Sequence, residues 1–462
     1  MSTEIKAKKH GFFNTKVDMV DGPLLKNYII YFLPFIVSTL IQQSYHAADM
    51  MILGQFAGDT AVAAVGATGS LTNLVLNLFI GIAAGYNILL LRYYGAKNKD
   101  AVKSTNSTAL IFSLGVGVIM MVVGMIFTEP FLRLTNCPEE IVSDAALYAR
   151  IYFLALPGLM FNNYFNSLIK ATGDSTSGLL YIGISGAVNI VLNLFFILVL
   201  GLTVAGVAIA TTVSIYVSTV CIFLKTTRAE GLGKLELRGI RFSFAIMKKL
   251  IKLGLPMALT TVISSLVGVF SSSIKNSYGT AAIAGIAASG SIISITGSVA
   301  YPVSSVTTSF VTQNMGAGRQ DNVFRVKRFS TVISITIAIV NFLVVVAFAR
   351  LLLSLYIPGA EEAISVGKKA LLYSGIRVLI NGIVVVSSAM LSAYGKSLVQ
   401  MIISLVNIGV NVLWLLVVYP LFSSIDTYLF TTVAVGIVYL ILVLSIERYY
   451  TRQYKNGNRF EL

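Results

Sequence analysis

The sequence predicts an all-α polytopic membrane protein, built from twelve transmembrane helices in two parallel six-helix repeats. Of the 462 residues, 56% are apolar and 11% are charged, whereas about a quarter of the residues in a soluble domain are charged. Apolar segments long enough to cross a bilayer recur from end to end. The expected spans are 28–56, 61–91, 104–127, 143–169, 177–200, 203–224, 249–277, 282–315, 329–356, 364–392, 398–420 and 427–446.

The basic residues fix the orientation of these spans. With the N-terminus inside, 27 of the 34 Lys and Arg residues fall in cytoplasmic segments. Such an excess is the positive-inside rule, so we expect a multi-pass protein of the cell membrane with both termini cytoplasmic. The net charge of +15 then reflects membrane topology and requires no nucleic-acid partner.

Short motifs of the first half recur in the second half at an offset of about 220 residues. Leu33-Pro34 returns as Leu255-Pro256, and Val188-Asn189-Ile190-x-x-Asn193 returns as Val406-Asn407-Ile408-x-x-Asn411. Six spans per repeat mean that both repeats cross the membrane in the same direction, as in transporters with parallel repeats. Two equivalent lobes with a site between them suit alternating access.

The repeat also predicts the domain boundaries. A cytoplasmic N-terminal segment is expected first, followed by an N-lobe that holds helices one to six. A polar, glycine-bearing cytoplasmic linker then leads to a C-lobe of helices seven to twelve and a cytoplasmic tail. The corresponding ranges are 1–26, 27–225, 226–248, 249–447 and 448–462.

Asp49 lies inside the first apolar span, where a carboxylate costs several kcal/mol and by default marks an ion or substrate site. Gln42, Tyr45 and His46 share one helical face with it. The alternative is that Asp49 lies near the end of its span and reaches the headgroups. Pro34, fifteen residues earlier, is expected to kink this helix and to act as a hinge.

Motifs across the chain resemble the bacterial multidrug and toxic compound extrusion (MATE) family. They are Gly22-Pro23-Leu24-Leu25-Lys26, Ala48-Asp49-x-x-x-x-Gly54-Gln55-Phe56-Ala57-Gly58, Arg92-Tyr93-Tyr94-Gly95-Ala96 and Val188-Asn189-Ile190-x-Leu192-Asn193. The resemblance implies two six-helix lobes around a central cavity. It also implies export of cationic or amphipathic small molecules in exchange for protons or sodium, with no cofactor.

The resemblance assigns a cation-coupling site in the N-lobe. Asp49 matches the family's acidic residue in helix one, Asn189 matches a polar residue of the cation site, and Thr211 matches another in helix six. Asn193 is a departure, since many relatives carry Asp there. The C-lobe spans also lack an acidic residue away from their ends, so Asp49 is expected to carry the coupling with little help.

The coupling ion is open between proton and sodium. An isolated aspartate in apolar surroundings suits proton exchange, because burial disfavours its charged form. Sodium prefers oxygen ligands, which Asp49, Asn189, Asn193 and Thr211 could supply. Losing a second carboxylate weakens the sodium interpretation more, so the proton is favoured. No other metal site is expected, since neither the two histidines nor the two cysteines cluster.

Other polar residues in the spans have two interpretations each. His46 could relay a proton to or from Asp49, or it could hydrogen-bond a neighbour. Two further asparagine pairs, each one helical turn apart, could line a cavity or join helices. These pairs are Asn73 with Asn77 and Asn162 with Asn166.

Lys275 and Arg377 are cations within C-lobe spans. They could line the cavity and favour anionic or zwitterionic substrates; alternatively, Lys275 reaches the headgroups and Arg377 caps helix carbonyls. A flippase for lipid-linked saccharides, of the same superfamily, is therefore the alternative function. A membrane-embedded enzyme is not expected, because only His46 and Asp49 could supply its chemistry. No obligate protein partner is indicated.

Overall fold

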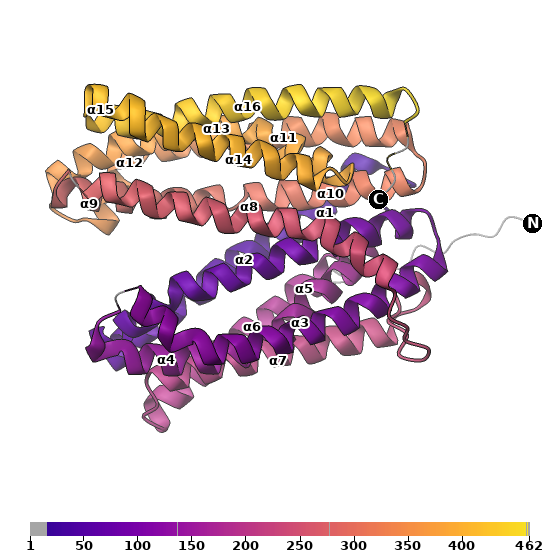
Figure 1. Ribbon diagram of the computed structural model, residues 1–462, viewed down its shortest axis with the longest axis horizontal. Helices are drawn as coiled ribbons and strands as arrows, with labels where there is room; N and C mark the ends of the chain where they lie inside the picture. Colours follow the sequence, from indigo (N-terminus) through magenta and orange to yellow (C-terminus); the bar gives the residue numbers. More distant parts are fainter. Residues whose placement is uncertain (1–15, 136, 277, 459, 461–462) are drawn as a thin grey trace, which may run out of the picture. The chain divides into compact units, whose positions relative to one another are not determined.

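The computed structural model describes residues 16–135, 137–276, 278–458 and 460, without the side chains of 45–47, 59, 70, 264–273 and 276. Every regular element in this part of the chain is a helix, which confirms the predicted all-α class. The first half holds α1 (Leu24–Ala57), α2 (Asp59–Gly95), α3 (Lys99–Leu134), α4 (Glu139–Phe153), α5 (Leu156–Ala171), α6 (Thr176–Leu194), η1 (Phe195–Val199), α7 (Val204–Arg228) and η2 (Gly231–Gly233). The second half holds α8 (Phe244–Asn276), α9 (Thr280–Gly297), α10 (Ala300–Gly316), α11 (Gln320–Ala347), α12 (Ala349–Tyr356), α13 (Glu361–Ala393), α14 (Ser397–Leu413), η3 (Trp414–Val418), α15 (Tyr419–Phe422) and α16 (Ile425–Lys455) (Figure 1).

The long helices have the dimensions of membrane spans. Ten helical segments of the described chain are long and apolar enough to cross a bilayer, and the bent pair α4–α5 would be an eleventh span. α8 occupies the position of the expected seventh span. The apolar runs form helices here because a helix satisfies its own backbone hydrogen bonds where no water is present.

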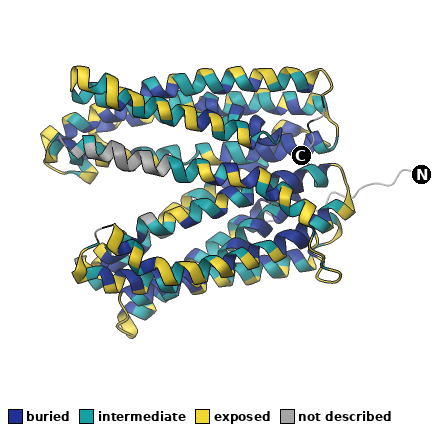
Figure 2. Ribbon diagram, viewed as in Figure 1, coloured by how far each residue is buried: buried dark blue, intermediate teal, exposed yellow. Residues whose placement is uncertain are grey.

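The middle of α3 shows why these helices need an apolar solvent. Ile119 and Ile126 are 61% and 62% exposed, and Val118 and Val122 are 46% and 45% exposed. Exposed residues along α3 are drawn in yellow in Figure 2. A contiguous apolar face of this kind suits contact with lipid.

Two expected spans are each made of two helices. The span expected over 143–169 bends by 45° between α4 and α5, just before Pro157 in the first turn of α5. The span expected over 282–315 breaks between α9 and α10, where Pro302 follows. Proline lacks the backbone N–H that would continue the preceding helix, which accounts for both breaks.

The ninth span is shorter than expected. Its helix was predicted over 329–356, but α11 ends at Ala347 and the short helix α12 follows after Phe348. The apolar run continues through this break, so hydrophobicity alone gave no signal for it. Arg350, in the first turn of α12, pairs with Glu361 of α13 at 2.8 Å and so lies outside the apolar span.

The chain divides into two compact units. The first consists of Met1–Thr68 and Leu110–Arg241, and the second of Gly69–Ala109 and Phe242–Leu462. In the first unit, α6 packs between α1 and α7, and α7 also packs against α4 and α5. In the second unit, α13 is central and packs against α9, α10, α11 and α16.

Glycines explain why the later part of α2 groups with the second half of the chain. A Cβ at Gly81 or Gly85 would overlap the backbone of α8 at Ala258 or Gly254. A Cβ at Gly95 would likewise overlap the backbone of α10 at Gln313. Small residues allow such close helix packing in membranes. The lobe boundaries predicted from the repeat differ from this grouping over residues 69–109, and they stay a prediction.

Candidate functional site

Asp49 is a buried carboxylate in the C-terminal part of α1, with 8% of its surface exposed. Its Oδ1 accepts a hydrogen bond of 2.5 Å from Nδ2 of Asn193 on α6. Among the described residues, Asp49 forms no ion pair with a Lys or Arg. A neutral donor therefore holds this acid, and no cation neutralises it.

The hydrogen bonds continue from Asn193 to two more residues. Asn193 Nδ2 also donates to Asn189 Oδ1 at 3.4 Å, and Asn189 Nδ2 donates to Thr211 Oγ1 of α7 at 3.3 Å. The Thr211 hydroxyl donates to the backbone oxygen of Val207 at 2.9 Å. The structure thus joins all four residues that the resemblance placed in the coupling site. We call this set the Asp49 chain: Asp49, Asn193, Asn189 and Thr211.

The local structure of α6 presents both asparagines to α1 and α7. They are one helical turn apart, so their side chains share a face, and both are buried, with 2% of Asn189 and none of Asn193 exposed. Directly after Asn193 the backbone changes to the π-helix η1. Single π-helical turns within α-helices often lie at functional sites.

Apolar side chains surround the end of α1 next to Asp49. Leu53, one turn further along α1, is fully buried in a cluster with Val65, Ile197 and Val207. Asp49 therefore does not extend to the surface as the headgroup alternative requires. Tyr148 of α4 packs against this cluster. Tyr148 was not predicted from the sequence, because no polar periodicity marks it.

The hydrogen-bond donors and acceptors of the Asp49 chain determine which ion or group it can bind. Asn193 directs its amide N–H groups toward Asp49 and Asn189, so it offers donors at the carboxylate. Its buried Oδ1 has no hydrogen-bond partner among the described residues. This arrangement can take up a proton on Asp49, and the Asn193 oxygen is available to accept a hydrogen bond. No group of three or more His, Cys, Asp or Glu in the described chain could hold a metal.

The remaining polar residues of α1 give less information. Gln42 is exposed. The side chains of Tyr45 and His46 lie outside the described residues, so the proton-relay interpretation stays a prediction. α1 continues through Pro34, whose backbone oxygen accepts a hydrogen bond of 2.6 Å from Ser38 Oγ. The hinge role of Pro34 also stays a prediction.

The two other asparagine pairs do not join the Asp49 chain. Asn73 and Asn77 lie on the part of α2 that belongs to the second unit, where Asn73 is exposed and Asn77 is half-buried. Asn162 of α5 donates to the backbone oxygen of Ile215 on α7 at 3.4 Å, which is a bond between helices. Asn166 lies where α5 faces Gly178 of α6.

The two cations of the second unit are placed differently. Lys275 is half-buried in the last turn of α8. Arg377 is exposed at the midpoint of α13, and its guanidinium makes no hydrogen bond or ion pair with any residue that the structure describes. The predicted helix-capping role of Arg377 is thus wrong for the described backbone, because no carbonyl accepts from it.

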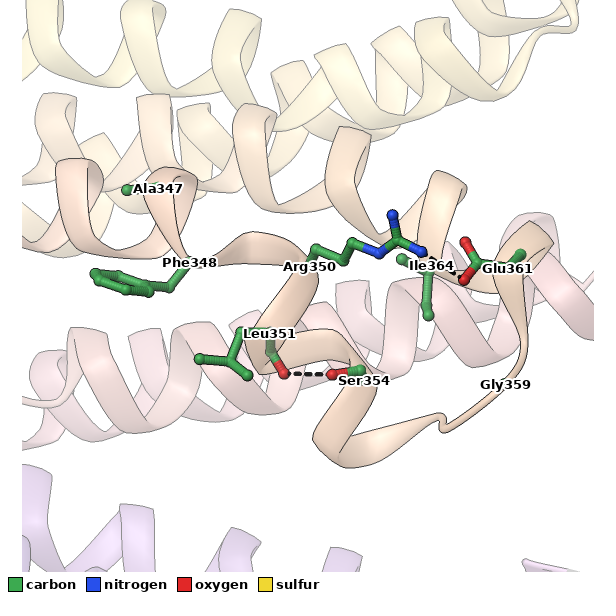
Figure 3. A pocket seen from close by; sticks show the side chains of 8 residues that line it. All are labelled: Ala347, Phe348, Arg350, Leu351, Ser354, Gly359, Glu361 and Ile364. Carbon is green, nitrogen blue, oxygen red and sulfur yellow. Dashed lines mark hydrogen bonds and ion pairs between the residues drawn. The ribbon is translucent and has the colours of Figure 1, made fainter.

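A pocket of about 510 Å³ lies at the junction of α11, α12 and α13. Arg350 and Glu361 form their ion pair beside it, and Ser354 bonds back to Leu351 within α12 (Figure 3). None of the predicted site residues lines this pocket. It therefore carries no part of the candidate coupling site.

A comparison with protein families matches the MatE family model twice, over residues 34–195 and 256–417. Together the two matches cover more than half of the chain. The chain belongs to the MatE family. The two matches follow each other along the chain, which agrees with the internal repeat. Members of the MatE family are membrane transporters and not enzymes, and this protein is one of them.

Known relatives share modest sequence identity with this MatE protein. It is 28% identical over 393 residues to a probable multidrug resistance protein, YoeA, of Bacillus subtilis, a match that covers 83% of this chain and 84% of that protein. It is 23% identical over 450 residues to an FAD transporter of Shewanella oneidensis, covering 94% and 96% of the two chains.

Solved structures of other transporters share the fold. An outward-facing multidrug resistance MATE transporter superposes with a TM-score of 0.87 at 21% identity, covering 96% of this chain and 99% of the other. A MOP superfamily transporter from Pyrococcus furiosus, described as having a binding pocket of reversed polarity, gives a TM-score of 0.86 at 22% identity, with coverage of 96% and 99%. At these identities the likeness establishes the fold alone.

Proposed function

We propose that this MatE transporter is a secondary active antiporter that exports cationic or amphipathic drugs in exchange for protons, by alternating access. The observation that carries the proposal is the buried Asp49 chain, which joins an acid of α1 to polar residues of α6 and α7. Similarity to a probable multidrug resistance protein supports drugs as the substrate class. The proposed location is the plasma membrane, with both termini cytoplasmic.

Hydrogen-bond direction supports the proton over sodium. A sodium ion needs several oxygen ligands that face it together, whereas Asn193 presents N–H groups to both Asp49 and Asn189. Asn189 likewise presents an N–H group to Thr211. Binding sodium would require these amides to turn around. Protonation of Asp49 requires no such change.

The alternative function, a flippase for lipid-linked saccharides, depends on Lys275 and Arg377 as partners for a pyrophosphate. These residues lie on different helices, α8 and α13, and no described contact joins them. The exporter is favoured because hydrogen bonds join Asp49, Asn193 and Asn189, whereas no described contact joins the two cations.

Gradient-driven transport in proteoliposomes tests the proposal. A cationic rhodamine ester is the substrate, and either a pH gradient or a sodium gradient is imposed on the same vesicles. We expect dye accumulation with the pH gradient alone. Transport driven only by sodium would overturn the choice of ion, and absence of transport with both gradients would overturn the exporter.

A further inference from the structure

Arg377 occupies an unusual position for a charged side chain. It is the central residue of the 33-residue helix α13, so in a helix centred on the bilayer about 15 Å of hydrocarbon separates it from either headgroup layer. This distance is too long for an arginine side chain to span. Intramembrane charges of this kind face a partner or a water-filled cavity and mark substrate pathways.

No acidic side chain that the structure describes neutralises this charge. Two other cations of the second unit do have acidic partners: Lys327 pairs with Glu447 at 2.7 Å, and Lys369 with Asp426 at 2.9 Å. Arg377 has no such acid among the residues that the structure describes. A carboxylate, phosphate or sulfonate from outside the protein would supply the missing partner, and the planar guanidinium binds such groups through two parallel hydrogen bonds.

The rest of α13 shows that Arg377 lies on a polar, accessible face. Asn381, one turn further along, is also exposed. Gly375 and Gly382, on roughly the opposite side of the helix, pack closely against Phe342 and Ala338 of α11. An exposed polar face at the centre of a membrane helix is unsuited to lipid, so we assign it to a water-filled cavity.

Aromatic rings lie one helical turn from Arg377. The Tyr373 ring is 6.2 Å from that of Phe430 on α16, and Phe430 is 6.0 Å from Trp414 of η3. The indole Nε1 of Trp414 is buried without a hydrogen-bond acceptor among the described residues. The stem of Arg377 lies next to Gly436 of α16, which leaves room for it. Tyr373, one turn from Arg377, thus belongs to a row of aromatic rings that includes Phe430 and Trp414.

From this arrangement we infer that Arg377 binds an acidic group of the transported compound, while Tyr373 and Phe430 contact its aromatic ring. The substrate class is an amphipathic aromatic compound with a carboxylate, sulfonate or phosphate. This inference rests on the proposed function, because it names a substrate class for the same transporter. A positively charged group of another substrate would find no acidic partner at Arg377.

Dye binding to the purified full-length chain tests the inference without relying on transport. Carboxyfluorescein is the anionic probe and the rhodamine ester is the cationic one, each followed by fluorescence anisotropy. Arg377→Gln should raise the Kd for carboxyfluorescein about tenfold or more, because hydrogen bonds to charged groups are lost. It should leave the Kd for the rhodamine ester unchanged or lower. Arg377→Lys should fall between wild type and Arg377→Gln.

Arg350→Gln is the matched control, since Arg350 of α12 pairs with Glu361, the first residue of α13. It should bind both dyes as wild type does. Equal effects of Arg377→Gln on both dyes, no effect on either, or no binding of carboxyfluorescein to wild type would each overturn the inference. If phosphatidylglycerol added to phosphatidylcholine vesicles displaces the dye, the acidic group comes from lipid, which overturns the assignment to a transported compound.

Transport separates this inference from the proposed function. If carboxyfluorescein binds in an Arg377-dependent manner but neither dye moves under an imposed gradient, the antiporter proposal fails and the subsite stands. If the rhodamine ester is transported but carboxyfluorescein shows no dependence on Arg377, the subsite fails and the antiporter stands.

Discussion

The asparagine pair of α6 and the corresponding pair of α14 have the same local structure but different surroundings. Both pairs are one turn apart, and a π-helix follows each, η1 in the first half and η3 in the second. Asn193 bonds to Asp49, whereas the side-chain oxygens of Asn407 and Asn411 have no hydrogen-bond partner among the described residues. The repeat preserved the backbone of both sites, while a chain of hydrogen bonds to an acid is formed only in the first.

This comparison assigns different chemistry to the two halves. Among the described residues, the buried Asp49 of the first half pairs with no cation, and the exposed Arg377 of the second half pairs with no acid. An acid of this kind can exchange a proton, whereas the arginine can only bind an anion, because it stays charged. The proton would therefore act in the first half, and the anionic part of a substrate in the second.

Asp49→Asn removes the acid that distinguishes the two halves, and the largest effect is expected there. The substitution keeps the side-chain size but cannot release a proton, so gradient-driven efflux of the rhodamine ester should fall to the level of protein-free vesicles. Asp144→Asn, at an exposed site on α4, should retain wild-type efflux. Near-normal efflux by the Asp49 variant would remove Asp49 from the coupling mechanism.

Gly95 and Gly316 occupy corresponding positions of the two repeats, and each packs closely against the backbone of another helix. A Cβ at Gly95 would overlap the backbone of Gln313, and one at Gly316 would overlap that of Arg92. We expect Gly95→Ala to lower the free energy of unfolding by about 1–3 kcal/mol, the usual cost of overpacking, and to lower Tm in detergent. Gly115→Ala meets no neighbouring atom and should leave Tm unchanged or raise it. Equal Tm values for both variants would contradict this packing.

Asn193→Ala and Asn411→Ala compare the two asparagine pairs directly. Removing the amide that donates to Asp49 should lower efflux about tenfold, because a hydrogen bond to a charged group contributes 1.5–3 kcal/mol. Asn411→Ala removes no described hydrogen bond, so efflux should change less than twofold by the same reasoning. Efflux measured at matched protein density distinguishes these outcomes, and equal losses would mean that the halves share the chemistry.

Thr211→Val tests the far end of the Asp49 chain, where the smallest effect is expected. The hydroxyl accepts only a long hydrogen bond of 3.3 Å from Asn189, so its loss should lower efflux about threefold. Thr211→Ser retains the hydroxyl and should restore most of the rate. A loss as large as that of Asn193→Ala would show that Thr211 contacts the ion or the substrate itself.

The sequence predicted much of the fold, because apolar length, charge asymmetry and repeated motifs are properties of single segments. It also selected Asp49, Asn193, Asn189 and Thr211, which the structure joins by hydrogen bonds; their coupling role stays a prediction. The breaks before Pro157 and Pro302 and the end of α11 were missed, since hydropathy continues across them.

Features that depend on packing between distant segments were also out of reach. Tyr148 was not selected because its contact with the apolar cluster around Leu53 arises only when distant segments pack together. The grouping of residues 69–109 with the second half depends on glycine contacts such as that of Gly81 with Ala258. Such contacts have no local signal beyond the presence of a small residue.

In the proposed antiport, Asp49 exchanges a proton when substrate binds. This exchange is tested most directly by proton release from purified protein in weakly buffered detergent, measured as the rhodamine ester is added. Because linked ligands lower each other's affinity reciprocally, we expect wild type to release a proton near the pH at which Asp49 titrates, and Asp49→Asn to release none. Equal release by both proteins, or none by wild type while the dye binds, would contradict the account.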